Sequence, residues 1–200
     1  MKKAIVKYYR IKSDKIAPSD FPIRIVFISD LHNVSIGEQN KLLLNKIDSL
    51  APDLVLLGGD TIIGKPNKAM DTGLDFIKAL GEKYPLCVAN GNHEYRLKIY
   101  PETYGDMYEQ YLEAIEKAGV TLLSNKSVTI SSKDTSITIH GLELDRKYYS
   151  RFKKQGLSVT DVEDYLGSID DDKYHILLAH NPRYGKTYMD WGADLTLAGH

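Results

Sequence analysis

Cysteine is nearly absent from this 200-residue chain, and long hydrophobic runs are absent altogether. The single cysteine, Cys87, excludes an internal disulfide and favours a reducing compartment. It lies in the apolar run 85–89, so we interpret it as a buried strand residue. No apolar stretch reaches the roughly 18 residues that a membrane-spanning helix needs, and residues 1–10 lack the apolar centre of a signal peptide.

An excess of charge of either sign is also missing. The 26 lysines and arginines nearly balance the 27 acidic residues, which gives a formal net charge of −1. Overall charge therefore offers no argument for binding nucleic acid or an anionic membrane. The hydrophobic fraction of 42% is ordinary for a globular protein. We predict one domain over residues 1–200, in which residues 1–22 form an N-terminal strand or extension.

Short apolar runs alternate with helical patterns along the chain. Five runs predict strands buried on both faces: 23–29, 53–57, 86–89, 174–179 and 194–198. Apolar residues at helical spacing predict helices over 38–50, 67–80, 104–118 and 158–169. Near-alternating Val, Ile and Thr predict further strands within 3–12 and 127–144, with a turn at 132–134. The sum is an α/β fold with some antiparallel strands.

Polar side chains follow the predicted strands at the points where they end. The set comprises Asp30, His32, Asp60, Asn92, His93, His180 and His200. In open α/β sheets the carboxyl ends of strands carry the functional groups, so these residues can converge on one crevice. Each is weak evidence alone, and a lone histidine such as His180 is more often structural. Together, carboxylates and imidazoles suit Mn, Fe or Zn, and such a site can hold two ions that share one carboxylate.

One family has this set of residues in this order. The blocks Asp30-x-His32, Gly59-Asp60, Gly91-Asn92-His93-Glu94, His180 and Gly199-His200 resemble the signature of the calcineurin-like metallophosphoesterases. That signature reads D-x-H, G-D, G-N-H-[DE], H and G-H-x-H, and the match runs from residue 25 to the last residue. The resemblance implies a four-layer α/β/β/α sandwich with mixed sheets, in which residues 23–200 form the catalytic core.

The resemblance also implies a cofactor of two divalent metal ions, Mn, Fe or Zn. One ion would have Asp30 and His32 as ligands, the other Asn92, His180 and His200, and Asp60 would bridge both. His93 would face the substrate and protonate the leaving oxygen or stabilise its charge. The implied reaction is in-line attack on phosphorus by a hydroxide that bridges the two metal ions.

The chain departs from the family pattern in two places. The family has a second histidine two residues after His200, where this chain stops, so we expect a truncated chain without its last strands and with weak or no activity. A partner chain that supplies the ligand and a weakly held first metal are alternatives. The arginines of the phosphoprotein phosphatases, in G-D-x-V-D-R-G and before G-N-H-E, are missing here. Their absence argues against a Ser/Thr phosphatase, and the opening Ile28-Ser29-Asp30-Leu31-His32 resembles that of the bacterial phosphodiesterase branch.

The expected substrate is a phosphodiester or phosphomonoester: a phosphorylated small molecule, lipid or nucleotide. Four residues in segments rich in Tyr, Lys and Arg are predicted to line its anionic edge: Tyr95, Arg96, Arg146 and Lys147. We expect a cytoplasmic location, with peripheral membrane association and the protein partner left open. A metal-binding scaffold and a nuclease are the alternative functions. The retained His93 argues against the scaffold, and the balanced charge against the nuclease.

Three further residues receive structural interpretations. Glu94 is predicted to cap the turn that follows it or to pair with a neighbour. His140 lies inside a predicted strand and is interpreted as a packed or surface histidine. His175 precedes an apolar run and is predicted to be exposed.

Overall fold

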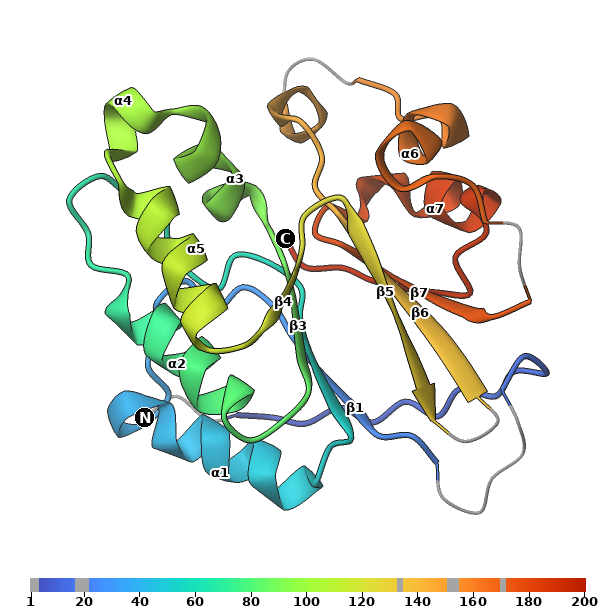
Figure 1. Ribbon diagram of the computed structural model, residues 1–200, viewed down its shortest axis with the longest axis horizontal. Helices are drawn as coiled ribbons and strands as arrows, with labels where there is room; N and C mark the ends of the chain where they lie inside the picture. The colour runs from blue at the N-terminus through green and yellow to red at the C-terminus, as the bar shows by residue number, and fades with distance from the viewer. Residues whose placement is uncertain (1–3, 17–21, 133–134, 151–154, 170–171) are drawn as a thin grey trace.

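Two four-stranded β-sheets packed face to face form the centre of the molecule, and helices cover the outer face of each (Figure 1). The structure is a computed structural model that describes residues 4–16, 22–132, 135–150, 155–169 and 172–200. The predicted arrangement of four layers, α/β/β/α, is therefore confirmed.

The first sheet is parallel and has the order β1-β2-β3-β4. Its strands are β1 (Ile25–Ile28), β2 (Leu54–Leu57), β3 (Leu86–Ala89) and β4 (Thr121–Leu123). The segments between them form the 3₁₀ turn η1 (Glu38–Asn40) and the helices α1 (Lys41–Leu50), α2 (Asp71–Gly81), α3 (Asn92–Ile99), α4 (Pro101–Tyr104) and α5 (Met107–Lys117). Parallel strands bring their carboxyl ends to one edge of the sheet, where ligands bind.

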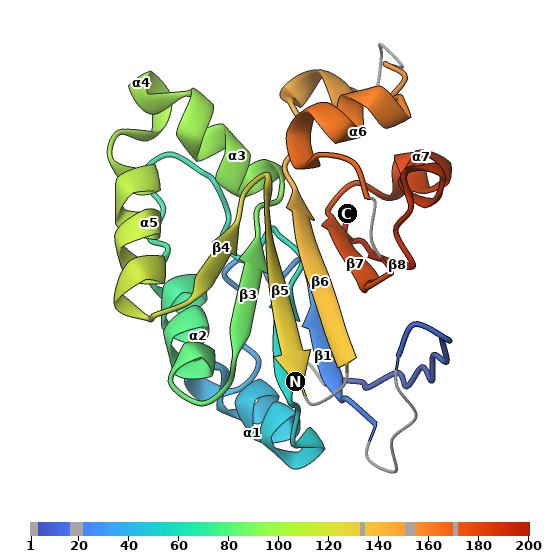
Figure 2. The ribbon, with the colours of Figure 1, turned by 45° about the vertical axis from the view of Figure 1, so that its right-hand side comes forward.

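The second sheet is mixed and has the order β5-β6-β7-β8. The chain enters it directly from β4 (Figure 2). The antiparallel pair β5 (Lys126–Ser132) and β6 (Thr135–Leu142) comes first, and β7 (Tyr174–Ala179) and β8 (Leu195–Leu197) then add in parallel. The remaining turns and helices are η2 (Arg146–Tyr149), α6 (Val159–Leu166), η3 (Pro182–Tyr184) and α7 (Gly185–Trp191). The predicted turn at 132–134 lies largely outside the described residues.

Alternation along the strands assigns each side chain to one of three apolar layers. In β2, Val55 and Leu57 pack against the helices of the first sheet, while Leu54 and Leu56 face the second sheet. In β7, Ile176 faces the first sheet and Leu177 packs with α6 and α7. Successive strand residues point to opposite faces, so a strand covered on both sides is apolar throughout. The continuous apolar runs in the sequence have this cause.

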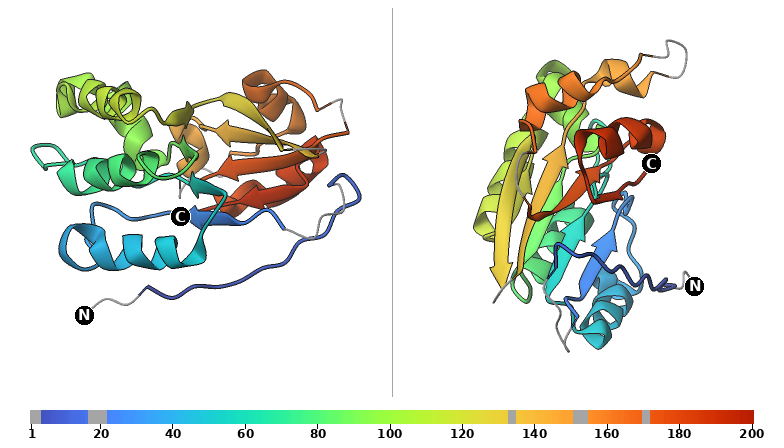
Figure 3. Two further views of the ribbon diagram at one scale, coloured as in Figure 1. Left: turned by 60° about the horizontal axis from the view of Figure 1, so that its bottom comes forward. Right: turned by 90° about the vertical axis from the view of Figure 1, so that its right-hand side faces the viewer.

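The prediction of a strand within residues 3–12 is wrong for the described part of that segment. Residues 4–12 form no strand, and Ile5 and Tyr9 are 86% and 82% exposed. The segment runs outside both sheets (Figure 3), and alternating residues form a strand only where a neighbouring strand satisfies the backbone hydrogen bonds. Without such a neighbour, the alternating apolar residues of this segment do not form a strand.

Each of the four predicted helices is present, but shorter than predicted. The stripe predicted for 38–50 begins three residues late as α1, and Leu42 is exposed rather than packed. Leu112 on α5 is exposed in the same way. Helices α3, α4 and α7 were not predicted. Among the described residues, no helix has the length and apolar character needed to cross a bilayer.

Candidate metal centre

The loops that follow β1 and β2 are joined by backbone hydrogen bonds beyond the ends of the strands. The amides of Asp30 and His32 donate to the carbonyls of Gly59 and Asp60, at 3.1 and 2.9 Å. The parallel pairing of the two strands therefore continues into the loops. This pairing places the Asp30 and His32 side chains beside Asp60.

Four of the predicted metal ligands have left-handed backbone conformations. The φ values are 58° at Asp30, 50° at His32, 51° at Asp60 and 60° at His200. Such conformations are uncommon for residues other than glycine and are enriched at functional sites. Here they turn side chains out of the strand direction and toward a common centre.

The carboxylate of Asp60 lies in the middle of this group, although the side chain is almost fully buried. Its Oδ2 atom is 3.1 Å from His180 Nε2 and 3.9 Å from Nε2 of both His32 and His93. Its Oδ1 atom accepts the backbone N–H of His93 at 2.8 Å. Two sets of three possible ligands thus share Asp60: one with His32 and His93, the other with His180 and His200.

Asp30 and His200 complete the group of side chains near Asp60. Asp30 Oδ1 is 3.6 Å from His32 Nε2 and 3.8 Å from His180 Nε2. The backbone N–H of His200 donates to Asp30 Oδ2 at 3.1 Å, and its ring centroid lies 5.6 Å from that of His180. The predicted ligands from β1, β2, β7 and the residues after β8 therefore converge in space.

The hydrogen bonding of the two ring nitrogens of His180 suits a metal ligand. A backbone carbonyl only accepts, so the contact of 2.8 Å between His180 Nδ1 and Gly58 O fixes the proton on Nδ1. The buried Nε2 then has no hydrogen-bond partner, and its approach to Asp60 Oδ2 does not have hydrogen-bond geometry. An imidazole held by a carbonyl on one nitrogen, with the other nitrogen free, is the usual arrangement of a metal ligand.

Asn92 opens helix α3 directly before His93. In the orientation that satisfies both ends of its amide, the side-chain oxygen accepts from Arg96 Nη2 at 3.2 Å and from the His93 N–H at 3.3 Å. Its role as a metal ligand stays a prediction.

His93 differs from the other histidines in its tautomer. The backbone N–H of Gly64 donates to His93 Nδ1 at 2.9 Å, so in the neutral ring the proton is on Nε2, which faces Asp60. Burial lowers the pKa of His93, and the charge of Arg96 acts in the same direction against that of Asp60. His93 is therefore placed to donate a hydrogen bond from a neutral ring.

Without a metal ion, the charged forms of Asp60 and His180 stabilise each other, and an ion bound to His180 Nε2 would replace its proton. Burial disfavours the ionised form of Asp60, but His180 and the His93 N–H outweigh this effect and lower its pKa. Burial likewise disfavours the charged form of His180, but Asp60 overrides it and raises the pKa to about 8. The centre thus holds a carboxylate that remains ionised despite burial.

The buried carboxylate of Glu94 holds the loop that contains Asp60. Its Oε2 accepts the N–H groups of Asp60 and Gly91, both at 2.9 Å, and its Oε1 accepts that of Ile62 at 3.1 Å. Burial and the charge of Asp60 raise its pKa to about 7, against the effect of these donors. The predicted cap is confirmed, and the bonds to the Asp60 loop are a further role that local spacing did not reveal.

Two glycines let the Asp60 loop and the start of α3 cross closely. Gly59 has a φ of 93°, and a Cβ on it would lie 2.6 Å from the Cα of Gly91. The Cα of Gly91 is a backbone atom and cannot move aside as the end of a flexible side chain could. Together with Glu94, this contact fixes Asp60 relative to His93.

Gly59→Ala is expected to lower the free energy of unfolding by about 3 kcal/mol, because it adds backbone strain to a clash with backbone. Urea denaturation measures the loss. The matched control is Gly105→Ala, whose φ is 60° but whose Cβ would meet nothing within 4 Å. That change should cost only about 1 kcal/mol. Equal losses at the two positions would contradict the close crossing.

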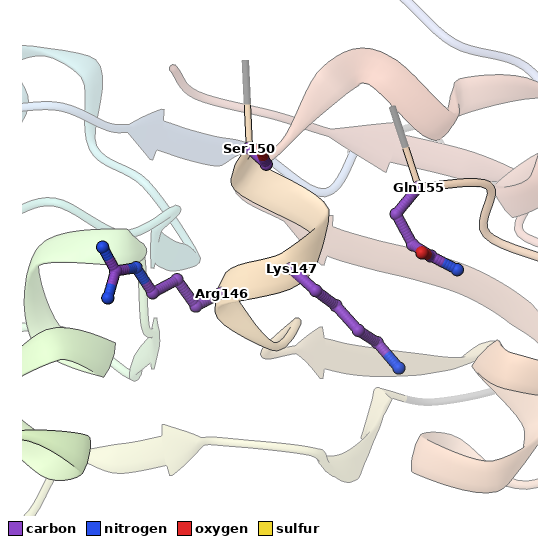
Figure 4. A pocket seen from close by; sticks show the side chains of 4 residues that line it. All are labelled: Arg146, Lys147, Ser150 and Gln155. Atoms are coloured by element: carbon purple, nitrogen blue, oxygen red, sulfur yellow. The ribbon is translucent and has the colours of Figure 1, made fainter. Parts of the chain in front are cut away.

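The four predicted substrate residues have partners within the protein. Tyr95 donates from its hydroxyl to Asp145 Oδ1 at 3.0 Å, and Arg96 Nε donates to the Asn92 carbonyl at 3.0 Å. Arg146 and Lys147 extend to opposite sides of η2 (Figure 4). With Ser150 and Gln155 they line a cavity of about 310 Å³. Their contact with a substrate stays a prediction.

Two histidines lie outside the centre, and one prediction about them is wrong. His175 is 3% exposed rather than exposed, because its strand β7 is covered on both faces. It lies against His140, with 2.9 Å between His140 Nε2 and His175 Nδ1. His140, also buried, is packed as predicted and has the Ser127 hydroxyl on its other nitrogen at 2.6 Å.

Tyr149, at the end of η2, belongs to the centre and was not predicted. Its ring meets that of His200 edge-on, with centroids 6.0 Å apart at an angle of 87°. Burial raises the pKa of the Tyr149 hydroxyl well above its usual range, and the neighbouring Tyr188 and the charge of Asp60 add to the effect. A tyrosine among 14, without a recognisable motif, gave no signal in the sequence.

Comparison with known proteins gives a consistent picture. A family model described as calcineurin-like phosphoesterase matches residues 23–200. The protein YpbG of Bacillus subtilis is 30% identical over 182 residues, which cover 90% of this chain and 61% of YpbG. Phosphodiesterase YaeI of Escherichia coli is 25% identical over 192 residues, which cover 90% of this chain and 60% of YaeI. The chain thus spans about three fifths of these two relatives.

A solved structure has the same fold. The phosphopantetheinyl hydrolase PptH from Mycobacterium tuberculosis aligns with a TM-score of 0.55 at 16% sequence identity. The alignment covers 88% of this chain and 82% of that one. At this identity the likeness concerns the fold alone.

Proposed function

This chain belongs to the calcineurin-like phosphoesterase family, and from that premise we propose that it hydrolyses a phosphoester with two divalent metal ions at the Asp60 centre. The observation that carries the proposal is the sharing of one buried carboxylate between two sets of ligands. When bound, the ions would polarise the phosphoryl group and lower the pKa of an attacking water. We propose that the ions are Mn, Fe or Zn.

The residues of the centre have distinct tasks in this proposal. One ion would be held by His32 and Asp60 with Asp30, because His93 keeps the proton on its Nε2. The other would be held by Asp60, Asn92, His180 and His200. His93 would donate its Nε2 proton to the leaving oxygen or to a phosphoryl oxygen, since Gly64 holds the ring in that tautomer. A donor so oriented has a use in catalysis and none in a scaffold, which favours the enzyme.

We propose a phosphodiester as the preferred substrate, within the class of phosphorylated small molecules, lipids and nucleotides. The donor at the centre, His93, is neutral, and the loop 61–64 after Asp60 contains no arginine. A singly charged diester needs less compensating charge than a doubly charged monoester. A relative, YaeI, is named a phosphodiesterase. Tyr95, Arg96, Arg146 and Lys147 would line the substrate edge, and a cytoplasmic location fits the single buried cysteine.

The test is hydrolysis of bis-p-nitrophenyl phosphate with and without Mn²⁺. We expect activity, weak in this chain, that chelation abolishes, and His93→Ala should lower kcat by about 10²- to 10³-fold without loss of metal. The control His93→Asn keeps an acceptor for the Gly64 N–H but cannot reach the centre, so it should be equally inactive while remaining as stable as the original chain. Metal-loaded protein that hydrolyses neither diesters nor monoesters would overturn the proposal in favour of a scaffold.

A further inference from the structure

The backbone around Tyr149 is held on both sides by side chains. Before it, Asp145 accepts from the hydroxyls of Tyr95 and Tyr165, at 3.0 and 2.9 Å. After it, the Ser150 carbonyl accepts from Arg183 Nη1 at 3.1 Å. Tyr149 therefore sits in a fixed position beside the metal centre and not on a free loop.

The neighbouring tyrosines all use their hydroxyls within the protein. Tyr184 donates to the Tyr148 carbonyl at 2.9 Å, and Tyr188 donates to the Asn181 carbonyl at 2.9 Å. Tyr149 packs against the same apolar layer, yet within the described part of the chain its hydroxyl has no hydrogen-bond partner. The hydroxyl is therefore available to a partner from outside the protein, such as a bound ligand.

That partner would reach Tyr149 through the metal centre. The ring lies edge-on to that of His200, one of the predicted ligands, with centroids 6.0 Å apart. The centre also lacks the arginines with which phosphoprotein phosphatases of this family grip a phosphate. A phenol hydroxyl in this place can supply the hydrogen bond that an arginine would otherwise provide.

We propose that Tyr149 is a substrate-contacting residue, whose hydroxyl donates a hydrogen bond to an oxygen of the phosphoryl group bound at the Asp60 centre. The proposal rests on the proposed function for the identity of the substrate. It adds a second neutral donor to the side chains that would touch the reacting group. No proton is transferred by Tyr149, so no change in the chemistry of the reaction is implied.

The test compares Tyr149→Phe with Tyr104→Phe. Tyr104, on α4, is also half-buried and also has no hydrogen-bond partner among the described residues, but no contact connects it with the centre. Tyr149→Phe should lower kcat/KM for bis-p-nitrophenyl phosphate by about 10- to 100-fold, because one donor to the transition state is lost. It should also weaken the binding of dimethyl phosphate, measured by calorimetry. Metal content and melting temperature should match those of Tyr104→Phe.

The outcomes separate this inference from the proposed function. If the original chain hydrolyses no phosphoester, the proposed function fails, and the affinity for dimethyl phosphate still decides the role of Tyr149: weaker binding in Tyr149→Phe supports it. Unchanged activity and affinity in Tyr149→Phe would overturn the inference. So would a loss that comes with lower metal content or a lower melting temperature, because Tyr149 would then act on the fold or on His200 and not on the substrate.

Discussion

Asp60→Asn is expected to lower kcat/KM by about 10³-fold or more and to reduce the number of metal ions retained after dialysis. The wild-type carboxylate uses Oδ1 for the His93 N–H and presents Oδ2 to three histidines. Asparagine can keep the first contact, but its NH₂ group would then face the ring nitrogens and repel a cation. The shared ligand would be lost while the shape of the side chain is kept.

Metal content by elemental analysis and kcat/KM by hydrolysis of the diester measure the effect. The matched control is Asp190→Asn on α7, which removes a carboxylate paired with Lys186 at 2.6 Å on the surface. It should leave both quantities unchanged. If Asp60→Asn retained the same metal content and activity within about threefold, Asp60 would not be the residue that the two sets of ligands share.

Glu94→Ala is expected to have the largest effect on stability. The side chain is 1% exposed and accepts three backbone N–H groups, which would all lose their acceptor. A buried donor without a partner costs about 1–3 kcal/mol, so the free energy of unfolding should fall by about 3–6 kcal/mol. The Asp60 loop should also lose its attachment to α3, and metal affinity should fall with it.

Urea denaturation in the presence of a chelator isolates the effect on the fold from that on metal binding. Glu94→Gln keeps one oxygen acceptor, so its loss should be intermediate. Glu113→Ala, an exposed glutamate on α5 paired with Lys117, serves as the control and should cost less than about 1 kcal/mol. A cost of that same size for Glu94→Ala would mean that solvent replaces the carboxylate.

The parallel strands and the ligands at their ends could be predicted because both leave a local trace. Buried strands read as apolar runs, and the residues that follow them break the run with Asp, Asn or His. The family pattern then gave the order of the blocks. The structure brings Asp30, His32, Asp60, His180 and His200 together as that order implied.

Other features depend on contacts that span the chain. Helix α3 has few apolar residues and was taken for a loop, because it is fixed by Glu94 and by the start of the motif rather than by an apolar stripe. His175 was predicted to be exposed because it precedes an apolar run, yet its strand is covered by α7 and by the first sheet. Tyr149 meets His200 only once two segments far apart in sequence are folded.

The ligands come from both sheets and from both ends of the chain: Asp30 accepts from His200, 170 residues later. An ion held at that junction closes a loop of this length, and the entropy that a cross-link removes from the denatured chain grows with the loop it closes. The metal ion would then act as a removable cross-link. With metal, amide protons in the two sheets should exchange with solvent as one unit, and without metal, sheet by sheet.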